Sequence, residues 1–158
     1  MKRRLFILRH ALPESHSQEK SDHARVLTAQ GELQAMSIAE KIKSSYTLAK
    51  VYSSDALRAK KTAAIVSERN GISFELAPKI YSSAPSQIKN LISKIPDNLN
   101  SAMLVGHNPS FSELVTDLTA SSVRLSQAEC AVLESELDSW ALFESVDWHL
   151  LEILRPDT

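Results

Sequence analysis

The spacing of apolar residues along the chain predicts short strands that alternate with longer helices. Short apolar runs are typical of buried strands, whereas apolar residues that recur every three or four positions are typical of helices that cover a core. Strands are expected at residues 4–8, 50–54, 72–76 and 102–106, with two more at 131–137 and 148–154 joined by a turn at 137–139. Helices are expected at residues 28–45, 54–71, 85–96 and 107–120. Residues 121–129 show no clear pattern.

The expected helices also have recognisable ends. The first has an apolar stripe at positions i, i+3, i+4 and i+7, formed by Ala35, Ile38, Ala39 and Ile42. The second can be capped by Ser54 or Asp55 and can end at Gly71. The fourth has Asn108 as its expected cap and Pro109 at its first position.

This order of elements favours an α/β fold, a three-layer α/β/α sandwich in which helices cover both faces of a mostly parallel sheet. The C-terminal end is richer in strands. The 158 residues, without internal repeat or linker, are expected to form one domain over 1–158.

Composition narrows the possible partners. The chain is 43% hydrophobic and 23% charged, which is typical of a globular protein. Its 18 Lys and Arg against 19 Asp and Glu give a net charge of −1, so no general attraction to nucleic acid or to an anionic membrane is expected. Cys130 is the single cysteine, and no apolar stretch approaches the length of a membrane span. A cytoplasmic enzyme or binding module is expected, and any anion must be recognised by a local cluster.

Charged side chains follow three of the expected strands, at the end where open α/β sheets bind ligands. Arg9 and His10 follow the first strand, and His107 follows the fourth. Arg58 lies in the first turn of the helix after the second strand. We therefore expect two guanidinium groups and two imidazoles at one edge of one sheet.

Each of these residues also has an ordinary structural explanation. Arg9 and His10 can simply make a strand end polar, His107 can fill a corner, and Arg58 can pair with Asp55. However, the positive end of a helix dipole disfavours a cation such as Arg58 by some tenths of a kcal/mol. The four side chains have no obvious carboxylate partners, so they would repel one another unless an anion lay between them. A phosphoryl group suits two arginine forks and two imidazole donors.

Three segments of the sequence, "LRHA", "SSDALRAKKTA" and "VGHNP", resemble in their order and spacing the signature segments of the histidine phosphatase superfamily. That superfamily shares the phosphoglycerate mutase-like fold. The short length, the segment "RVLTAQG" and the closing pattern "AVLESELDSW...LLEILRP" are most similar to its bacterial phosphohistidine phosphatase branch, the SixA type. The resemblance runs from about residue 4 to residue 155.

The resemblance implies a role for each residue of the cluster. His10 would be the nucleophile that attacks phosphorus, with its other ring nitrogen donating to a backbone carbonyl. Arg9, Arg58 and His107 would hold the non-bridging oxygens and stabilise negative charge in the transition state. No metal or other cofactor is implied, and the sequence has no Cys or His cluster with the spacing of metal ligands.

The general acid is where the sequence departs from many members of the family. They carry a Glu after the third strand, whereas the comparable segment here offers Lys79 and Tyr81 but no carboxylate. Asp22 is the expected acid because the short branch has an Asp at the matching place, and Glu14 is the second choice. The alternative is that Asp22 is only a solvated loop residue.

Smaller departures and candidates remain. Ala11 stands where the family usually has Gly, which is tolerable if its φ is negative and is expected to reduce activity without abolishing it. Ser15 and Ser54 are weaker candidates for hydroxyl contacts to phosphate, whereas Asn108 is expected to cap its helix. The remaining histidines are expected to have no catalytic role: His16, His23 and His149.

The resemblance implies a metal-independent phosphatase that acts through phospho-His10, with phosphohistidine on a signalling protein as the favoured substrate. If the general acid is weak or missing, a phosphoramidate is a better substrate than an alkyl phosphate ester, because its leaving group departs more easily. The alternatives are a phosphomonoesterase for a small phosphorylated metabolite and a non-catalytic module that binds phosphate or a phosphoprotein. A mutase is disfavoured because the chain lacks long insertions that would enclose a bisphosphate.

Overall fold

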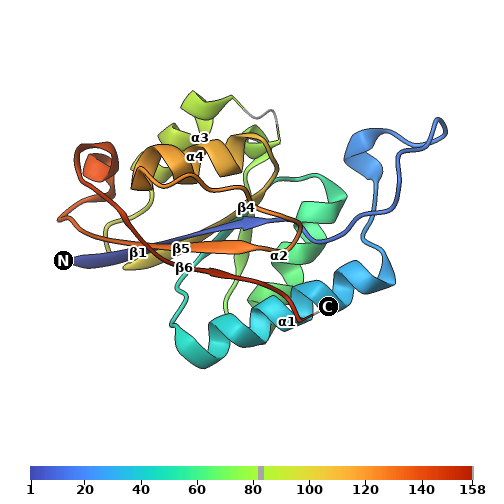
Figure 1. Cartoon of the computed structure of the whole chain (residues 1–158), viewed down its shortest axis with the longest axis horizontal. Coiled ribbons are helices and arrows are strands. Elements are labelled where there is room, and N and C mark those ends of the chain that lie inside the picture. The colour runs from blue at the N-terminus through green and yellow to red at the C-terminus, as the bar shows by residue number, and fades with distance from the viewer. Residues whose placement is uncertain (82–83, 158) are drawn as a thin grey trace.

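A computed structural model of the chain, which describes residues 1–81 and 84–157, has a central six-stranded sheet with helices on both sides (Figure 1). The strands are β1 (Lys2–Arg9), β2 (Val51–Ser53), β3 (Phe74–Leu76), β4 (Ser101–Gly106), β5 (Cys130–Glu136) and β6 (His149–Leu154). The α-helices are α1 (Ala29–Ser45), α2 (Leu57–Arg69), α3 (Pro85–Ser93) and α4 (Ser110–Thr119). Three short 3₁₀ helices are η1 (Asp22–Ala24), η2 (Pro78–Ile80) and η3 (Trp140–Ser145).

The strand order is β3-β2-β4-β1-β5-β6. The first four strands in this order run parallel, whereas β5 is antiparallel to β1 and β6 is antiparallel to β5. The carboxyl ends of β2, β4 and β1 therefore lie next to one another. This is the sheet edge at which the sequence predicts the charged cluster.

The helices form one layer on each face of the sheet (Figure 1). Alternate residues of β1 point to opposite faces: Leu5 and Ile7 pack in the core shared with α3 and α4, and Phe6 and Leu8 pack in the core shared with α1 and α2. The predicted three-layer α/β/α sandwich with a mostly parallel sheet is confirmed.

Helix α1 starts where the sequence predicts and lies tightly against the segment after His10. The Thr28 hydroxyl accepts a hydrogen bond from the Gly31 amide at 3.0 Å and donates to the Leu12 carbonyl at 3.1 Å. A Cβ at Gly31 would lie 2.2 Å from that carbonyl oxygen, so only glycine allows this approach. The predicted stripe is confirmed, because its four members are fully buried: Ala35, Ile38, Ala39 and Ile42.

Helices α2 and α4 begin later than expected, so the predicted capping positions are wrong: the N-cap residues are Ala56 and Pro109, and neither side chain caps its helix. The Ser54 hydroxyl accepts from the Ala56 amide at 3.2 Å, and the Asn108 side chain accepts from the Ser112 amide at 3.2 Å. Gly71 follows the end of α2 with φ of 67°, the left-handed conformation expected at a helix exit.

The connection from β5 to β6 is longer than the predicted turn at 137–139. After β5 the chain forms η3, which buries Trp140 and Phe143 against the core. The Trp140 indole nitrogen donates to the Leu99 carbonyl at 2.8 Å, and the buried Arg3 guanidinium lies 5.4 Å from the Trp140 ring centroid. Burying these two aromatic side chains requires the extra length. Within the described ranges, no helix is both long enough and apolar enough to cross a membrane.

Candidate active site

The pairing of β1 with β4 brings the two predicted active-site histidines together. Arg9 is the register partner of Gly106, and the His10 amide donates to the Gly106 carbonyl at 3.0 Å. His107 directly follows Gly106, and its ring centroid lies 5.2 Å from that of His10, with the ring planes at 52°. Both side chains are buried, with 5% and 7% exposure. The predicted proximity of His10 and His107 is therefore confirmed.

Arg58 reaches the same place from β2. The Ser54 amide donates to the Val105 carbonyl at 3.0 Å, which fixes the end of β2 beside β4. Helix α2 starts at Leu57, so Arg58 lies in its first turn as predicted, and it is 5% exposed. Its positive charge lowers the pKa of His107. We call Arg9, His10, Arg58 and His107 the basic cluster.

One ring nitrogen of His10 is fixed by a hydrogen bond to the backbone. Its Nδ1 lies 2.7 Å from the carbonyl oxygen of Ala11, and because a carbonyl oxygen only accepts, Nδ1 carries the hydrogen and Nε2 carries the lone pair. Burial lowers the pKa of His10 to about 3, and the neighbouring charges act in the same direction. At neutral pH the imidazole is therefore uncharged and able to act as a nucleophile at Nε2.

His107 is neutral for similar reasons. Burial, followed by the charge of Arg58, lowers its pKa to about 4. Its Nε2 lies 2.8 Å from the Ser54 hydroxyl, which can donate its hydrogen there and leave Nδ1 protonated. Ser54 is fully buried and occupied with His107 and the start of α2. The structure thus gives Ser54 a supporting position, whereas Ser15 is exposed.

Arg9 is held by the segment for which the sequence gives no prediction. Its Nη1 donates to the Leu125 carbonyl at 3.2 Å, and the Asn108 side chain donates to the same carbonyl at 2.7 Å. The Ala128 amide lies within hydrogen-bond distance of the carbonyls of Arg9 and His10, at 3.1 and 3.0 Å. Burial, followed by the charge of Arg58, lowers the pKa of Arg9. The loop before β5 therefore secures the end of β1.

Asp22, the expected acid, is also a carboxylate partner of Arg58, and the sequence pattern does not predict this pairing. Arg58 donates to the Asp22 side chain at 2.9 Å and to its backbone carbonyl at 2.8 Å, so the expectation that the cluster lacks a carboxylate partner is wrong. The alternative in which Arg58 pairs with Asp55 is not the arrangement found. Asp22 also accepts from Arg25 at 3.1 Å and from the Tyr81 hydroxyl at 2.8 Å. Burial raises its pKa, but the hydrogen bonds from Tyr81 and Arg58 outweigh this effect and bring the pKa to about 2.

The pairing with Asp22 spans a long stretch of chain, and for that reason local patterns do not reveal it. Helix η1 brings Asp22 against the start of α2, where Asp55 is instead paired with His23 at 3.0 Å. Glu14, the second candidate acid, pairs with Lys20 at 2.6 Å, and this hydrogen bond lowers its pKa. His16 and His149 are exposed.

Ala11 fits its position without backbone strain. Its φ is not positive, and it is fully buried, with its amide donating to the Thr62 hydroxyl at 3.1 Å. Its carbonyl is the group that fixes the tautomer of His10. The condition under which an alanine is tolerable here is therefore met.

Three buried nitrogens of the basic cluster have no hydrogen-bond partner within the ranges that the structure describes. They are Arg9 Nε, Arg58 Nε and His107 Nδ1. Buried polar groups are almost always paired, and each exception calls for an explanation such as a ligand. Convergent donors with positive charge form a site that suits a tetrahedral anion. Among the same residues, no three His, Cys, Asp or Glu side chains gather as metal ligands would.

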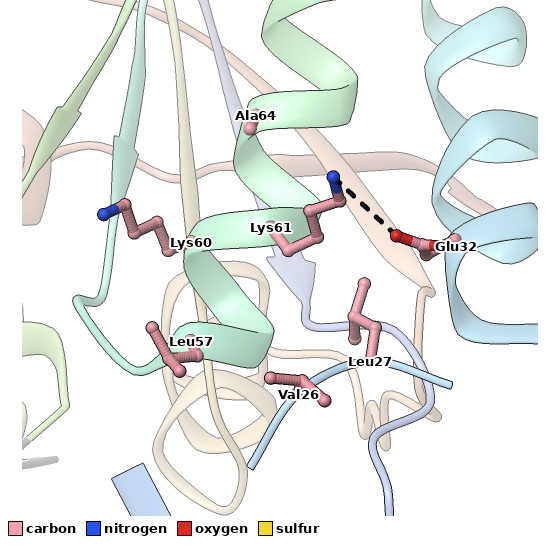
Figure 2. Close-up of a pocket in the computed structure, with 7 residues that line it drawn as sticks. All are labelled: Val26, Leu27, Glu32, Leu57, Lys60, Lys61 and Ala64. Atoms are coloured by element: carbon pink, nitrogen blue, oxygen red, sulfur yellow. Dashed lines mark ion pairs between the residues drawn. The ribbon is translucent and has the colours of Figure 1, made fainter. Parts of the chain in front are cut away.

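A groove of about 440 Å³ lies between the first turns of α2 and the segment after η1 (Figure 2). Leu57, the neighbour of Arg58, and Val26 contribute half-exposed apolar walls. Lys61 lies at its edge, 3.7 Å from Glu32. The residues of the basic cluster do not line this groove.

Known proteins share this sequence pattern and fold. The sequence profile of the histidine phosphatase superfamily (branch 1) matches residues 5–109. An uncharacterized chloroplastic protein from Arabidopsis thaliana is 30% identical over 99% of this chain and 79% of its own length. Among solved structures, a protein assigned as the phosphohistidine phosphatase SixA from Nakamurella multipartitia superposes with a TM-score of 0.83 at 23% identity, over 100% of this chain and 98% of its own.

A second solved structure has a different substrate in its name. The mycobacterial glucosyl-3-phosphoglycerate phosphatase superposes with a TM-score of 0.72 at 18% identity, over 96% of this chain and 98% of its own. At such identities these likenesses show the fold alone. The family match over residues 5–109 shows that the chain belongs to the histidine phosphatase superfamily, branch 1, and supports a phosphatase activity.

Proposed function

We propose that this protein is a metal-independent phosphatase that works through a phosphohistidine at His10 and removes phosphate from phosphohistidine on another protein. The observation that carries the proposal is the state of His10: Nδ1 is fixed on the Ala11 carbonyl, so Nε2 keeps its lone pair inside a cluster of cations. A general phosphate-binding module would not need one imidazole held neutral in this way.

In the first step, His10 Nε2 attacks phosphorus and the bond from phosphorus to the leaving group breaks. Arg9, Arg58 and His107 stabilise the charge that spreads over the three equatorial oxygens. All three side chains belong to the basic cluster, and Arg58 and His107 are 5% and 7% exposed. Removing one such donor typically costs about 10²- to 10³-fold in rate.

Asp22 supplies the proton for the leaving group in this proposal. In the free protein it is a carboxylate at neutral pH, with its pKa at about 2. A phosphoryl dianion bound at Arg58 shares the cation that stabilises the carboxylate and adds a like charge, and both effects raise the pKa of Asp22. Binding of the substrate therefore favours uptake of a proton from solvent by Asp22, and this is the proton that it donates to the leaving group. In the second step Asp22 takes a proton from the water that attacks phospho-His10, the P–N bond breaks, and phosphate leaves.

Phosphohistidine is the favoured substrate because its leaving group, an imidazole, departs more easily than an alkoxide. It therefore depends less on protonation by the general acid. The likeness to a protein assigned as the phosphohistidine phosphatase SixA supports the same choice, and our proposal includes a role in phosphorelay signalling. A phosphomonoesterase for small metabolites is the second candidate, because the likeness to glucosyl-3-phosphoglycerate phosphatase supports it and the basic cluster recognises the phosphoryl group itself.

A panel of three substrates tests the proposal: a histidine phosphotransfer domain phosphorylated with phosphoramidate, p-nitrophenyl phosphate, and a set of sugar phosphates. We expect the highest kcat/KM on the phosphorylated domain, no activity for His10→Ala, and no loss of activity after chelation of divalent metals. Equal rates on all three substrates would refute the choice of phosphohistidine, and phosphate binding without turnover would favour a binding module.

A further inference from the structure

We propose that Tyr81 is a positioning residue for the reaction: its hydroxyl holds the Asp22 carboxyl group beside the basic cluster, where that group protonates the leaving atom. This inference rests on the proposed function. The segment around Tyr81 is the one in which many relatives carry a glutamate acid, and here it carries a phenol that contacts an aspartate from elsewhere in the chain.

Tyr81 and Arg58 donate hydrogen bonds to the same oxygen of Asp22. The Tyr81 hydroxyl donates to Asp22 Oδ2 at 2.8 Å, and Arg58 Nη2 donates to that oxygen at 2.9 Å. The other oxygen, Oδ1, accepts from Arg25 Nε at 3.1 Å. Oδ2 is thus held both by Arg58, a member of the basic cluster, and by Tyr81.

The Tyr81 ring is packed between two histidines. Its edge-on contact with His107 has a centroid distance of 5.5 Å at 81°, and its contact with His23 has a distance of 4.9 Å at 84°. His23 is in turn held by Asp55 at 3.0 Å. The hydroxyl therefore points to Asp22 from a ring that the active site itself orients.

The backbone that carries Tyr81 is also anchored. The Tyr81 amide donates to the Pro78 carbonyl at 3.1 Å and closes the turn of η2. Ile80 is buried, and its methyl group lies so close to Gly106 that a Cβ there would come within 2.6 Å. Because Gly106 precedes His107, the turn that presents Tyr81 is packed on the strand that presents His107.

A phenol suits this task because it carries no charge. A phosphoryl dianion competes with Asp22 for a cation such as Arg58, but it does not attract the neutral phenol in the same way. When a dianion shares Arg58, the ion pair between Arg58 and Asp22 weakens, but the neutral Tyr81 donor is unaffected. The hydrogen bond to Asp22 raises the pKa of Tyr81, so the phenol keeps its hydrogen at neutral pH. It can donate to Oδ2 whether the carboxyl group is ionised or protonated, because a protonated carboxyl group keeps acceptor capacity. Tyr81 itself gains and loses no proton in the reaction.

The test compares two substrates that differ in their need for an acid: phenyl phosphate, which has the poorer leaving group, and p-nitrophenyl phosphate. We expect Tyr81→Phe to lower kcat/KM about tenfold on phenyl phosphate, the effect of one lost hydrogen bond, and much less on p-nitrophenyl phosphate. Asp22→Asn should show the same selectivity with a larger loss, and adding Tyr81→Phe to it should produce no further selective loss.

Tyr46→Phe is the matched control, because the Tyr46 hydroxyl also donates to a carboxylate, that of Glu152, away from the basic cluster. It should leave both substrates unchanged. An equal loss on both substrates for Tyr81→Phe, or a further selective loss in the Asp22→Asn background, would overturn the role of Tyr81 while His10-dependent activity upholds the proposed function. Activity that survives His10→Ala, or is absent from the wild type, would overturn both.

Discussion

A single backbone hydrogen bond fixes the positions of His10 and His107 relative to each other: the His10 amide donates to the carbonyl of Gly106, the residue before His107, at 3.0 Å. This bond continues the parallel ladder between β1 and β4 by one residue and sets the two imidazoles 5.2 Å apart. The sheet register therefore brings together the proposed nucleophile and one of the residues proposed to stabilise charge, before any side-chain contact contributes.

Arg58→Ala should lower kcat/KM on p-nitrophenyl phosphate about 10²- to 10³-fold. The variant loses a transition-state cation and also leaves the Asp22 carboxylate without the ion pair at 2.9 Å, so that carboxylate repels the phosphoryl group. Arg58→Lys is the control: it restores a charge without the planar fork and should recover part of the loss. If Arg58→Ala keeps more than about a tenth of wild-type activity, Arg58 does not contact the transferred phosphoryl group.

The two active-site histidines should remain neutral across the physiological range. The pKa values of about 3 for His10 and about 4 for His107 place both titrations well below the ordinary value of about 6.5. In ¹⁵N NMR spectra of the free enzyme, their ring signals should not move between about pH 8 and pH 5, and His10 should show a protonated Nδ1. Assignment follows from the signals lost in His10→Asn and His107→Asn. A transition near pH 6.5 for either ring would contradict the burial argument.

The same lowered pKa values predict a loss of stability in mild acid. In the unfolded chain both histidines titrate near pH 6.5, so below that pH the unfolded state binds protons that the folded state does not bind. The free energy of unfolding therefore falls as the pH falls from about 6.5 to 5, by up to about 1.4 kcal/mol per pH unit for each histidine. Urea unfolding at several pH values measures this slope. His10→Asn and His107→Asn should each flatten it, and an unchanged slope in both variants would count against this explanation.

Gly31 should be necessary for stability and for activity. A Cβ at residue 31 would lie 2.2 Å from the Leu12 carbonyl, so Gly31→Ala pushes α1 away from the segment that follows His10. We expect a loss of about 1–3 kcal/mol in the free energy of unfolding, together with a lower kcat. Gly71→Ala is the comparison: its Cβ meets open space, but φ is 67°, so it should cost about 1 kcal/mol or more and leave kcat unchanged. Equal effects of the two variants on kcat would contradict the account of Gly31.

The parts of the fold that depend on local periodicity were predictable. The α1 stripe, the buried strand before Arg9 and the helix exit at Gly71 follow from side-chain spacing and backbone preference, and the structure agrees with all three. The convergence of the basic cluster was predictable as well, because parallel strands present their carboxyl ends at the same edge.

The features that the sequence did not predict depend on contacts between distant segments. The pairing of Asp22 with Arg58 requires a loop to cross to the start of α2, and no local pattern encodes that crossing. The segment 121–129 shows no helical or strand periodicity in its side chains because its contacts with the end of β1 are made by backbone carbonyls and amides. The longer connection before β6 follows from burying Trp140, whose core position becomes evident only in three dimensions.

The most direct test of the central claim is to trap the phosphorylated enzyme. The wild-type protein, quenched at short times after mixing with a radiolabelled phosphate donor, should carry label that is lost in acid and kept in base, as expected for a phosphohistidine. Peptide mapping should place that label on His10, and His107→Ala should still acquire it, more slowly. Turnover of the donor with no label on His10, or label on His10→Ala, would contradict the account.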